Sequence, residues 1–256
     1  MALPLGWRTD LAVLGHSGSE IEEHDDHVLI RTPANPTYHW GNFVLVTHPA
    51  AVDDAEHWLD VFVAAFPQAL HRAIGLSAEP TPSSWATTGL EIEHEDVLAL
   101  SGLPAERPLA EGYAVRPLVN IVDWEQLVRL SLEEHHTEHR DSEEFLRESK
   151  TAQVRMVSAS VAAFFGVFAG AELVSCLGIV DCGGGVARYQ SVLTAAAHRR
   201  RGLTSHLLGR AAHWAAVRAL GELVIVADPD SAASRLYQSV GFVPVQRSSQ
   251  AYRAGA

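Results

Sequence analysis

Three consecutive arginines and a glycine, Arg199-Arg200-Arg201-Gly202, stand immediately before a stretch with helical periodicity. The first amides of a helix have no partner within the helix, and together with the helix dipole they favour a bound anion. Cationic side chains at that end are unfavourable to the dipole, so a solvated helix start explains them less well than an anion does. The segment therefore predicts a phosphate or pyrophosphate site, where the glycine lets the backbone approach the ligand closely.

The elements that must position this segment alternate between strand and helix patterns. Apolar spacing predicts a strand, two helices, three strands, a helix, a strand, a helix and a strand. Their ranges are 113–117, 122–134, 142–159, 162–168, 173–180, 188–194, 203–220, 223–227, 232–240 and 242 onward. Gly221 is placed to end the long helix in a left-handed conformation.

A second segment, residues 230–242, has the sequence Asp-Ser-Ala-Ala-Ser-Arg-Leu-Tyr-Gln-Ser-Val-Gly-Phe. It resembles the Asn-x-x-Ala-x-x-Leu-Tyr-x-x-x-Gly-Phe segment of the GNAT superfamily of N-acetyltransferases. Residues 199–204 likewise resemble the (Arg or Gln)-x-x-Gly-x-(Gly or Ala) loop of that superfamily. The resemblance covers residues 111–256 and implies the GNAT fold, an α/β (α+β) fold with a mixed sheet.

The resemblance implies acetyl-CoA as a co-substrate, with its pyrophosphate at the start of the long helix and its pantetheine arm along the end of the preceding strand. The residues that it assigns to acetyl-CoA are Leu193, Thr194, Arg199, Arg200, Arg201, Gly202, Leu203, Thr204, Asp230 and Tyr237. Two of them depart from the family pattern, because Thr204 stands where the family has Gly or Ala and Asp230 where it has Asn. The Thr204 amide can still donate, although its side chain adds bulk.

In that family an amine attacks the thioester carbonyl directly in a ternary complex, and the leaving thiolate needs a proton or a hydrogen bond. Tyr237 matches the family's general-acid tyrosine, and a phenol with a pKa of about 10 suits proton transfer to a thiolate. The alternative is a ring that only packs against the cofactor.

The attacking amine must first lose a proton, so a base or a water chain is needed. Our candidate is Glu134, which belongs to an ionisable cluster with Glu133, His135, His136, Glu138 and His139. For each member of this cluster a solvated helix end is the competing explanation. His135 and His139 also have the i, i+4 spacing of a metal pair. Because the family's reaction needs no metal, we predict no metal site.

The chain changes character near residue 108. Residues 101–112 are rich in Pro and Gly and lack a clear period, which predicts a linker. Residues 1–110 carry four Lys and Arg against sixteen Asp and Glu, whereas residues 111–256 carry fifteen of each kind. We therefore expect two domains, 1–108 and 109–256, with the catalytic machinery in the second.

The first domain lacks the arginine loop, yet its order of elements is similar to that of the second. The predicted elements are a strand at 43–47, a helix at 53–66, a strand at 70–76, a short helix at 82–88 and a strand at 91–100. We interpret this domain as a truncated, degenerate GNAT-like lobe. Within residues 33–43, the side chains of Tyr38, His39, Trp40 and Asn42 either line an acceptor pocket or serve only to pack the loop.

The excess negative charge repels nucleic acid and anionic membranes, so neither is expected as a partner. Without an apolar run near the roughly 20 residues that span a bilayer, or a signal-peptide pattern, a cytoplasmic location is expected. We expect an N-acetyltransferase acting on a primary amine of a small or amino-acid-like acceptor. The alternatives are a non-catalytic acyl-CoA sensor or scaffold and a protein lysine acetyltransferase. A homodimer and a monomer both stay open.

Overall fold

The structure is a computed structural model that describes residues 3–105, 107–134 and 143–255. The chain divides into two compact units, the first comprising Met1–Val97 with Gln246–Ala256 and the second Leu98–Val245. This division differs from the compositional boundary near residue 108, because the carboxyl-terminal strand pairs with strands of the first unit. Linker composition carries no information about pairing between strands so far apart in sequence.

The first unit is an α/β layer. Its elements are α1 (Leu5–Ser17), β1 (Glu20–Glu23), β2 (His27–Arg31), β3 (Phe43–Val46), α2 (Ala55–Ala65), β4 (Arg72–Leu76), most of β5 (Glu91–Ser101) and most of β11 (Val243–Arg253). Within this unit the strand order is β1-β2-β3-β4-β11-β5. The β3–β4 pair is parallel, whereas β1–β2, β2–β3 and β4–β11 are antiparallel, so the sheet is mixed.

Most predicted elements of the first unit are present, with two differences. The helix predicted at 82–88 is wrong, because those residues form turns. The Asp53 carboxylate holds this region by accepting bonds from the Thr81 amide at 2.6 Å, the Thr81 hydroxyl at 2.7 Å and the Ser84 hydroxyl at 3.0 Å. Helix α1 and strands β1 and β2 were not predicted.

The 33–43 segment packs against the core of the first unit. The Asn42 side chain accepts from the Thr32 amide at 2.9 Å and donates to the carbonyls of Asn35 and Tyr38 at 3.0 and 2.8 Å. Trp40 contacts Trp7, Phe43 and Tyr252. The His39 ring stacks on buried His71 with centroids 4.1 Å apart, and its Nδ1 lies 2.7 Å from the Tyr252 hydroxyl. These contacts favour the packing interpretation of the segment over an acceptor pocket.

The second unit holds the predicted order of strands and helices. Its elements are β6 (Tyr113–Pro117), α3 (Ile121–Glu134), α4 (Glu143–Ser158), β7 (Ala162–Ala169), β8 (Glu172–Asp181), β9 (Val186–Thr194), α5 (Leu203–Ala216), β10 (Glu222–Ala227) and α6 (Ala232–Ser239), with the adjoining ends of β5 and β11. The strand order is β5-β10-β9-β8-β7-β6. In the described part of this unit, β9–β10 is parallel, whereas β6–β7, β7–β8 and β8–β9 are antiparallel.

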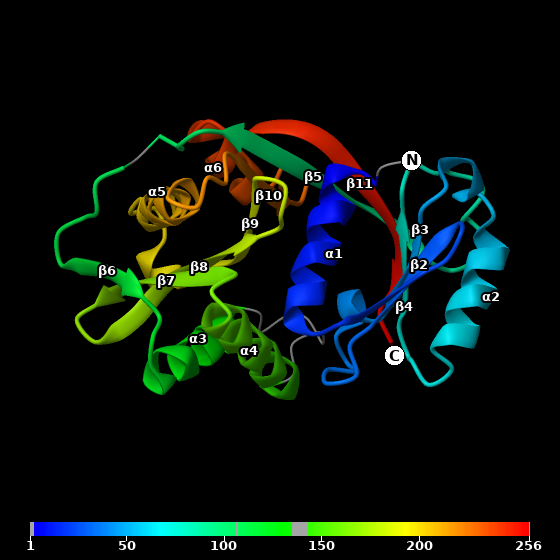
Figure 1. The fold of residues 1–256 in the computed structure, drawn as a ribbon, viewed down its shortest axis with the longest axis horizontal. Coiled ribbons are helices and arrows are strands. Elements are labelled where there is room, and N and C mark those ends of the chain that lie inside the picture. Colours follow the sequence, from blue (N-terminus) through cyan, green and yellow to red (C-terminus); the bar gives the residue numbers. More distant parts are fainter. Residues whose placement is uncertain (1–2, 106, 135–142, 256) are drawn as a thin grey trace. The chain divides into compact units, whose positions relative to one another are not determined.

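Strand β7 shows how this sheet is covered on both faces (Figure 1). Alternate residues of a strand point to opposite faces. Phe164 packs on Trp124 of α3, with ring centroids 5.3 Å apart. Phe165 and Val167 instead join the core that α5 builds with Leu207, Leu208 and Ala211. The sheet is thus sandwiched between α3 and α4 on one side and α5 on the other, which fixes where α5 begins.

Helix α5 ends earlier than the sequence predicts. Its last residue is Ala216, and Val217 forms the C-cap. Ala219, at φ 59°, takes the left-handed conformation that was expected of Gly221, and the Leu220 amide donates to the Ala215 carbonyl at 3.1 Å. The prediction for Gly221 is therefore wrong, and the turn closes two residues before it.

A bulge interrupts the β8–β9 ladder. Cys176 pairs with Leu193 and Gly178 with Gln190, so two residues of β9 lie opposite Leu177 alone. One of them, Ser191, has φ 50°. Such a bulge bends its strand and increases the local twist. The register of β9 with β10 covers only Val186 to Arg188 in the described part of the chain, on the other side of the bulge from Thr194.

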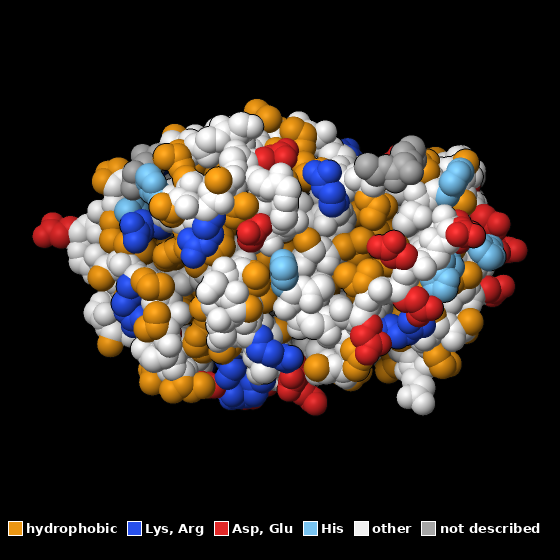
Figure 2. Space-filling model, viewed as in Figure 1, with side chains coloured by type: hydrophobic (Ala, Val, Ile, Leu, Met, Phe, Trp, Pro, Cys, Tyr) orange, Lys and Arg blue, Asp and Glu red, His pale blue; other side chains and the backbone are white. Residues whose placement is uncertain are grey.

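Charge is divided unequally between the units. The first unit contains fifteen Asp and Glu against five Arg, a net charge of −10, and the second contains sixteen against fourteen Lys and Arg, a net charge of −2. Figure 2 shows the Asp and Glu side chains crowded over the first unit and several Lys and Arg over the second.

None of the helices in the described residues is both long enough and apolar enough to cross a membrane.

The close contact of Gly178 with the Phe164 ring gives a test of the packing. A Cβ at Gly178 would lie 2.5 to 2.9 Å from three carbons of that ring. We expect Gly178→Ala to lower the free energy of unfolding by about 1–3 kcal/mol, the usual cost of overpacking. Urea denaturation measures it. Gly221→Ala is the control, since no heavy atom lies within 4 Å of the added carbon. Equal stability of the two variants would contradict this account.

Candidate functional site

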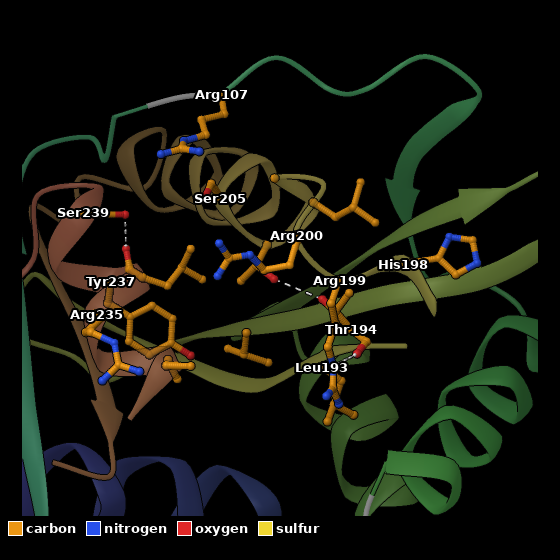
Figure 3. A pocket seen from close by; sticks show the side chains of 17 residues that line it. Arg107, Leu193, Thr194, His198, Arg199, Arg200, Ser205, Arg235, Tyr237 and Ser239 are labelled. Atoms are coloured by element: carbon orange, nitrogen blue, oxygen red, sulfur yellow. Dashed lines mark hydrogen bonds between the residues drawn. The ribbon is translucent and has the colours of Figure 1, made fainter. Parts of the chain in front are cut away.

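A cavity of about 690 Å³ lies in the second unit between the end of β9, the start of α5 and helix α6 (Figure 3). It begins on β9 beyond the bulge, at the point where the β9–β10 register has ended. The lining residues are Arg107, Val192, Leu193, Thr194, His198, Arg199, Arg200, Gly202, Leu203, Thr204, Ser205, Ala232, Ala233, Arg235, Leu236, Tyr237 and Ser239. The cavity therefore combines the end of one strand, the start of one helix and a face of another helix.

The loop before α5 is held in a strained shape. Arg200 has φ 65° and Gly202, the N-cap of α5, has φ 76°. A left-handed conformation costs a non-glycine residue about 1–2 kcal/mol, and such strain gathers at ligand sites. The loop is tied to β6 through His198, whose Nδ1 lies 2.9 Å from the Tyr113 hydroxyl. These constraints fix the position of the three arginines.

The start of α5 presents unpaired hydrogen-bond donors to the cavity. Gly202 has no side chain to cap the helix, and the first turn contains no acidic residue. The first helical bond of the turn runs from the His206 amide to the Gly202 carbonyl at 3.1 Å. The amides of Leu203, Thr204 and Ser205 therefore lack intrahelical partners by geometry. Ser205 is among the lining residues, but its hydroxyl is fully buried and has no hydrogen-bond partner.

Four arginines line the cavity, and none of the described lining residues is acidic. Arg199 and Arg200 come from the loop, Arg235 from α6 and Arg107 from the segment between β5 and β6. Figure 3 shows the Arg200 side chain reaching from the loop across the cavity toward α6. The surplus of guanidinium groups beside helix amides suits a ligand that carries several phosphoryl groups.

The side chain of Thr204 is hydrogen-bonded at the edge of the cavity. Its hydroxyl lies 3.0 Å from that of Thr194, which in turn lies 2.7 Å from the Ser175 hydroxyl. Ser175 also donates to the Leu193 carbonyl at 2.9 Å. The extra side chain thus belongs to a hydrogen-bonded chain that joins the start of α5 to β9 and β8, which gives a physical reason for a threonine here.

Asp230 shapes the start of α6 without lining the cavity. It has φ 57°, a conformation that Asp and Asn tolerate better than most residues. Helix α6 is capped by Ser231, whose hydroxyl accepts from the Ser234 amide at 3.0 Å. The Asp230 carbonyl accepts a hydrogen bond from Arg235. Asp230 therefore orients a cavity arginine through its backbone, a role that does not distinguish Asp from Asn.

Tyr237 extends from α6 toward the β9 side of the cavity (Figure 3). Its side chain is 4% exposed and packs edge-on against Phe242, with centroids 6.4 Å apart. Burial raises the pKa of Tyr237 to about 12. The phenol therefore keeps its proton at every pH at which the protein would work, and it is available as a hydrogen-bond donor in the cavity.

The cavity brings together most of the predicted cofactor residues. Eight of the ten line it, namely Leu193, Thr194, Arg199, Arg200, Gly202, Leu203, Thr204 and Tyr237, whereas Arg201 and Asp230 do not. The predicted base, Glu134, is the last residue of α3, and its side chain lies outside the described residues. His135, His136, Glu138 and His139 also lie outside them. In the described part of the chain no cluster of three or more His, Cys, Asp or Glu is arranged to hold a metal.

Sequence patterns missed several lining residues. Arg107 lies in a segment read from composition as a linker, and nothing local marks it as part of a site. Arg235 falls at a variable position of the 230–242 pattern, and Ser205 lies one residue beyond the 199–204 pattern. The third position of α5 was a signal that could have located Ser205, whereas Arg235, two residues before Tyr237, is not at helical spacing from it and carries no local signal.

Comparison with known proteins shows the family of one part of this unit. Residues 123–242 match the model of the Acetyltransferase (GNAT) family. This stretch of the second unit is a GNAT acetyltransferase domain. The match includes both the arginine loop and the Tyr237 segment, and members of this family generally transfer acyl groups from acyl-CoA. Among curated proteins, no match to the chain was found.

Solved structures have a similar fold over nearly the whole chain. A GCN5-related N-acetyltransferase from Kribbella flavida is 15% identical, covers 100% of this chain and 98% of its own, and has a TM-score of 0.69. An acetyltransferase of the GNAT family from Novosphingobium aromaticivorans is 17% identical over 98% and 96% of the two chains, with a TM-score of 0.61. A tandem GNAT protein from the clavulanic acid biosynthesis pathway is 13% identical over 94% and 87%, with a TM-score of 0.54. At these identities the likeness concerns the fold alone.

The unequal placement of two neighbouring arginines in the acetyltransferase domain gives a test of the site. Arg200 lines the cavity and Arg201 does not. We expect Arg200→Ala to weaken acetyl-CoA binding roughly tenfold to a hundredfold, as for loss of a charge-assisted hydrogen bond. The same truncation of exposed Arg201 should change the affinity by less than about threefold, because only screened attraction is lost. Isothermal titration calorimetry measures both. An equal loss of affinity in the two variants would mean that the ligand is held by the overall positive charge of the loop and not by contacts within the cavity.

Proposed function

We propose that the chain is an acetyl-CoA-dependent N-acetyltransferase that acylates a primary amine of a small or amino-acid-like acceptor. The observation that carries the proposal is the cavity itself, in which an uncapped helix start, arginines and a buried tyrosine lie together within a GNAT acetyltransferase domain. The start of α5 with its arginines suits phosphoryl groups, and the region beside Tyr237 suits the reacting thioester.

The chemistry of the lining residues fits acetyl-CoA. The α5 amides and the guanidinium of Arg200 would hold the diphosphate. The uncapped start of α5 supports this assignment, because its first amides have no partner within the helix and favour an anion. Strand β9 from Val192 to Thr194, which has left β10, would run beside the pantetheine arm.

In the proposed reaction the acceptor amine attacks the thioester carbonyl directly. The new C–N bond forms, the C–S bond breaks, and the electron pair of that bond leaves on sulfur. Tyr237 would donate a hydrogen bond, and finally its proton, to that sulfur, while the amine loses one proton to a base or to water. The raised pKa of Tyr237 makes the hydrogen bond its main contribution, because full transfer to a less basic thiolate is uphill.

Glu134 remains our candidate for the base that accepts the proton of the amine. It ends α3, the helix that covers the face of the sheet opposite α5. This role stays a prediction from the sequence.

We propose that the first unit is a degenerate GNAT-like lobe. The order β3, α2, β4 and then β5 in a mixed sheet supports this, as does the likeness of the whole chain to the fold of a tandem GNAT protein. The arginine-glycine loop has no counterpart in its sequence, so acetyl-CoA is proposed to bind once per chain.

Tyr237→Phe tests the catalytic proposal against a non-catalytic acyl-CoA sensor. Removing the hydroxyl should lower kcat roughly a hundredfold, the scale of general-acid catalysis, and leave the acetyl-CoA Kd nearly unchanged because the ring remains. A CoA-release assay across a panel of primary amines, paired with calorimetry, measures the two quantities. Tight acetyl-CoA binding without turnover of any amine by the intact protein would refute the enzyme and favour the sensor.

The pH dependence of turnover follows from the pKa of Tyr237. An ordinary tyrosine would be half ionised near about pH 10. With its pKa raised to about 12, Tyr237 stays protonated there, so loss of its proton should not lower kcat between about pH 8 and pH 10. A rate profile measured over that interval checks this. A fall in kcat near pH 10 in the native protein that Tyr237→Phe abolishes would contradict the buried, protonated tyrosine.

A further inference from the structure

The segment between β5 and β6 is fastened along the mouth of the cavity. The Gly102 amide donates to the Gly221 carbonyl at 3.3 Å, and the Ala105 amide donates to the Val240 carbonyl at 2.8 Å. His206 Nδ1 then lies 2.9 Å from the Arg107 carbonyl. These three contacts tie Gly102 to the turn after α5, Ala105 to the end of α6 and Arg107 to the first turn of α5. A flexible connection would need none of them.

Arg107 enters the cavity from this fastened segment. Its aliphatic stem lies beside the N-cap of α5, with Cδ 3.9 Å from the position that a Cβ on Gly202 would occupy. In Figure 3 the Arg107 side chain lies beyond Arg200 when the cavity is followed away from Thr194, on the side where Ser239 is found. The order along the cavity is therefore the β9 end, then Arg200, then Arg107.

This order separates two cationic positions. The first, at the start of α5, combines unpaired helix amides and Arg200, and the proposed function assigns it to a diphosphate. The second, Arg107, lies further from the reacting end. Coenzyme A carries a second and separate charge beyond its diphosphate, the phosphomonoester on the ribose 3′ oxygen. A phosphomonoester dianion is the strongest partner that a guanidinium finds in such a ligand.

We infer that Arg107 is a specificity-determining residue that recognises the 3′-phosphate of coenzyme A, so that the segment between β5 and β6 forms one wall of the cofactor site. This inference rests on the proposed function, because it takes acetyl-CoA as the ligand. Arg107 lies outside both the 199–204 and the 230–242 segments, so neither sequence pattern predicts this contact.

The experiment compares two ligands on the full-length chain. Calorimetry measures the Kd of acetyl-CoA and of 3′-dephospho-acetyl-CoA for the native protein, for Arg107→Ala and for the exposed-arginine control Arg129→Ala. The native protein should prefer acetyl-CoA by about tenfold or more, the scale of one charge-assisted contact. Arg107→Ala should lose that preference by weakening acetyl-CoA alone, with dephospho-acetyl-CoA changed by less than about threefold. Arg129→Ala should keep the native preference.

Folding does not confuse the result, because Arg107 is anchored through its main-chain carbonyl, which the substitution leaves in place. An equal weakening of both ligands would overturn the inference and place Arg107 at the diphosphate. Unchanged affinities for both would overturn it as well, because Arg107 would then contact neither ligand. If the native protein binds neither ligand, the proposed function fails before the inference is reached, so the two failures are distinct.

Discussion

The unpaired amides at the start of α5 are the constraint on which the site depends. A helix that begins in a protein needs partners for its first N–H groups, and most helices supply one from a capping side chain. Here the cap is Gly202, which has no side chain, and the buried Ser205 hydroxyl adds another donor without an acceptor. Arginines surround this end and carboxylates are absent from the described lining. The unpaired amides and the arginines therefore suit a ligand that carries negative charge and accepts hydrogen bonds.

The sheet makes room for that ligand through a defect in its ladder. The extra residue of β9 near Ser191 bends the strand away from regular pairing, and the register with β10 covers only the positions before the bulge. Helix α5, held on the sheet by Leu207, Leu208 and Ala211, then aims its amino-terminal end at the gap. The cavity thus follows from one strand irregularity and one well-packed helix, and neither would create it alone.

Sequence reasoning predicted the parts of this arrangement that are local. The order of elements in the second unit, the glycine N-cap of α5 and the placement of Tyr237 on α6 follow from periodicity and from two short segments. It failed where tertiary contacts override local pattern. Residues 82–88 form turns and not a helix, and Asp53 holds this region through hydrogen bonds with Thr81 and Ser84. Helix α5 ends at Ala216, and Ala219 takes the left-handed conformation that closes the turn. The bulge at Ser191 has no composition signal, because no glycine marks it.

The segment between β5 and β6 shows most clearly what composition leaves out. Proline, glycine and the lack of a period describe residues 101–112 correctly as irregular, but irregular chain is not the same as a free tether. Its amides and carbonyls need partners like any others, and Gly102, Ala105 and Arg107 find them on α5, α6 and the turn between α5 and β10. A backbone fastened in this way holds its side chains in place, so Arg107 is presented to the cavity at less entropic cost than on a mobile loop. A boundary drawn at residue 108 would therefore remove a wall of the site from the domain that contains the rest of it.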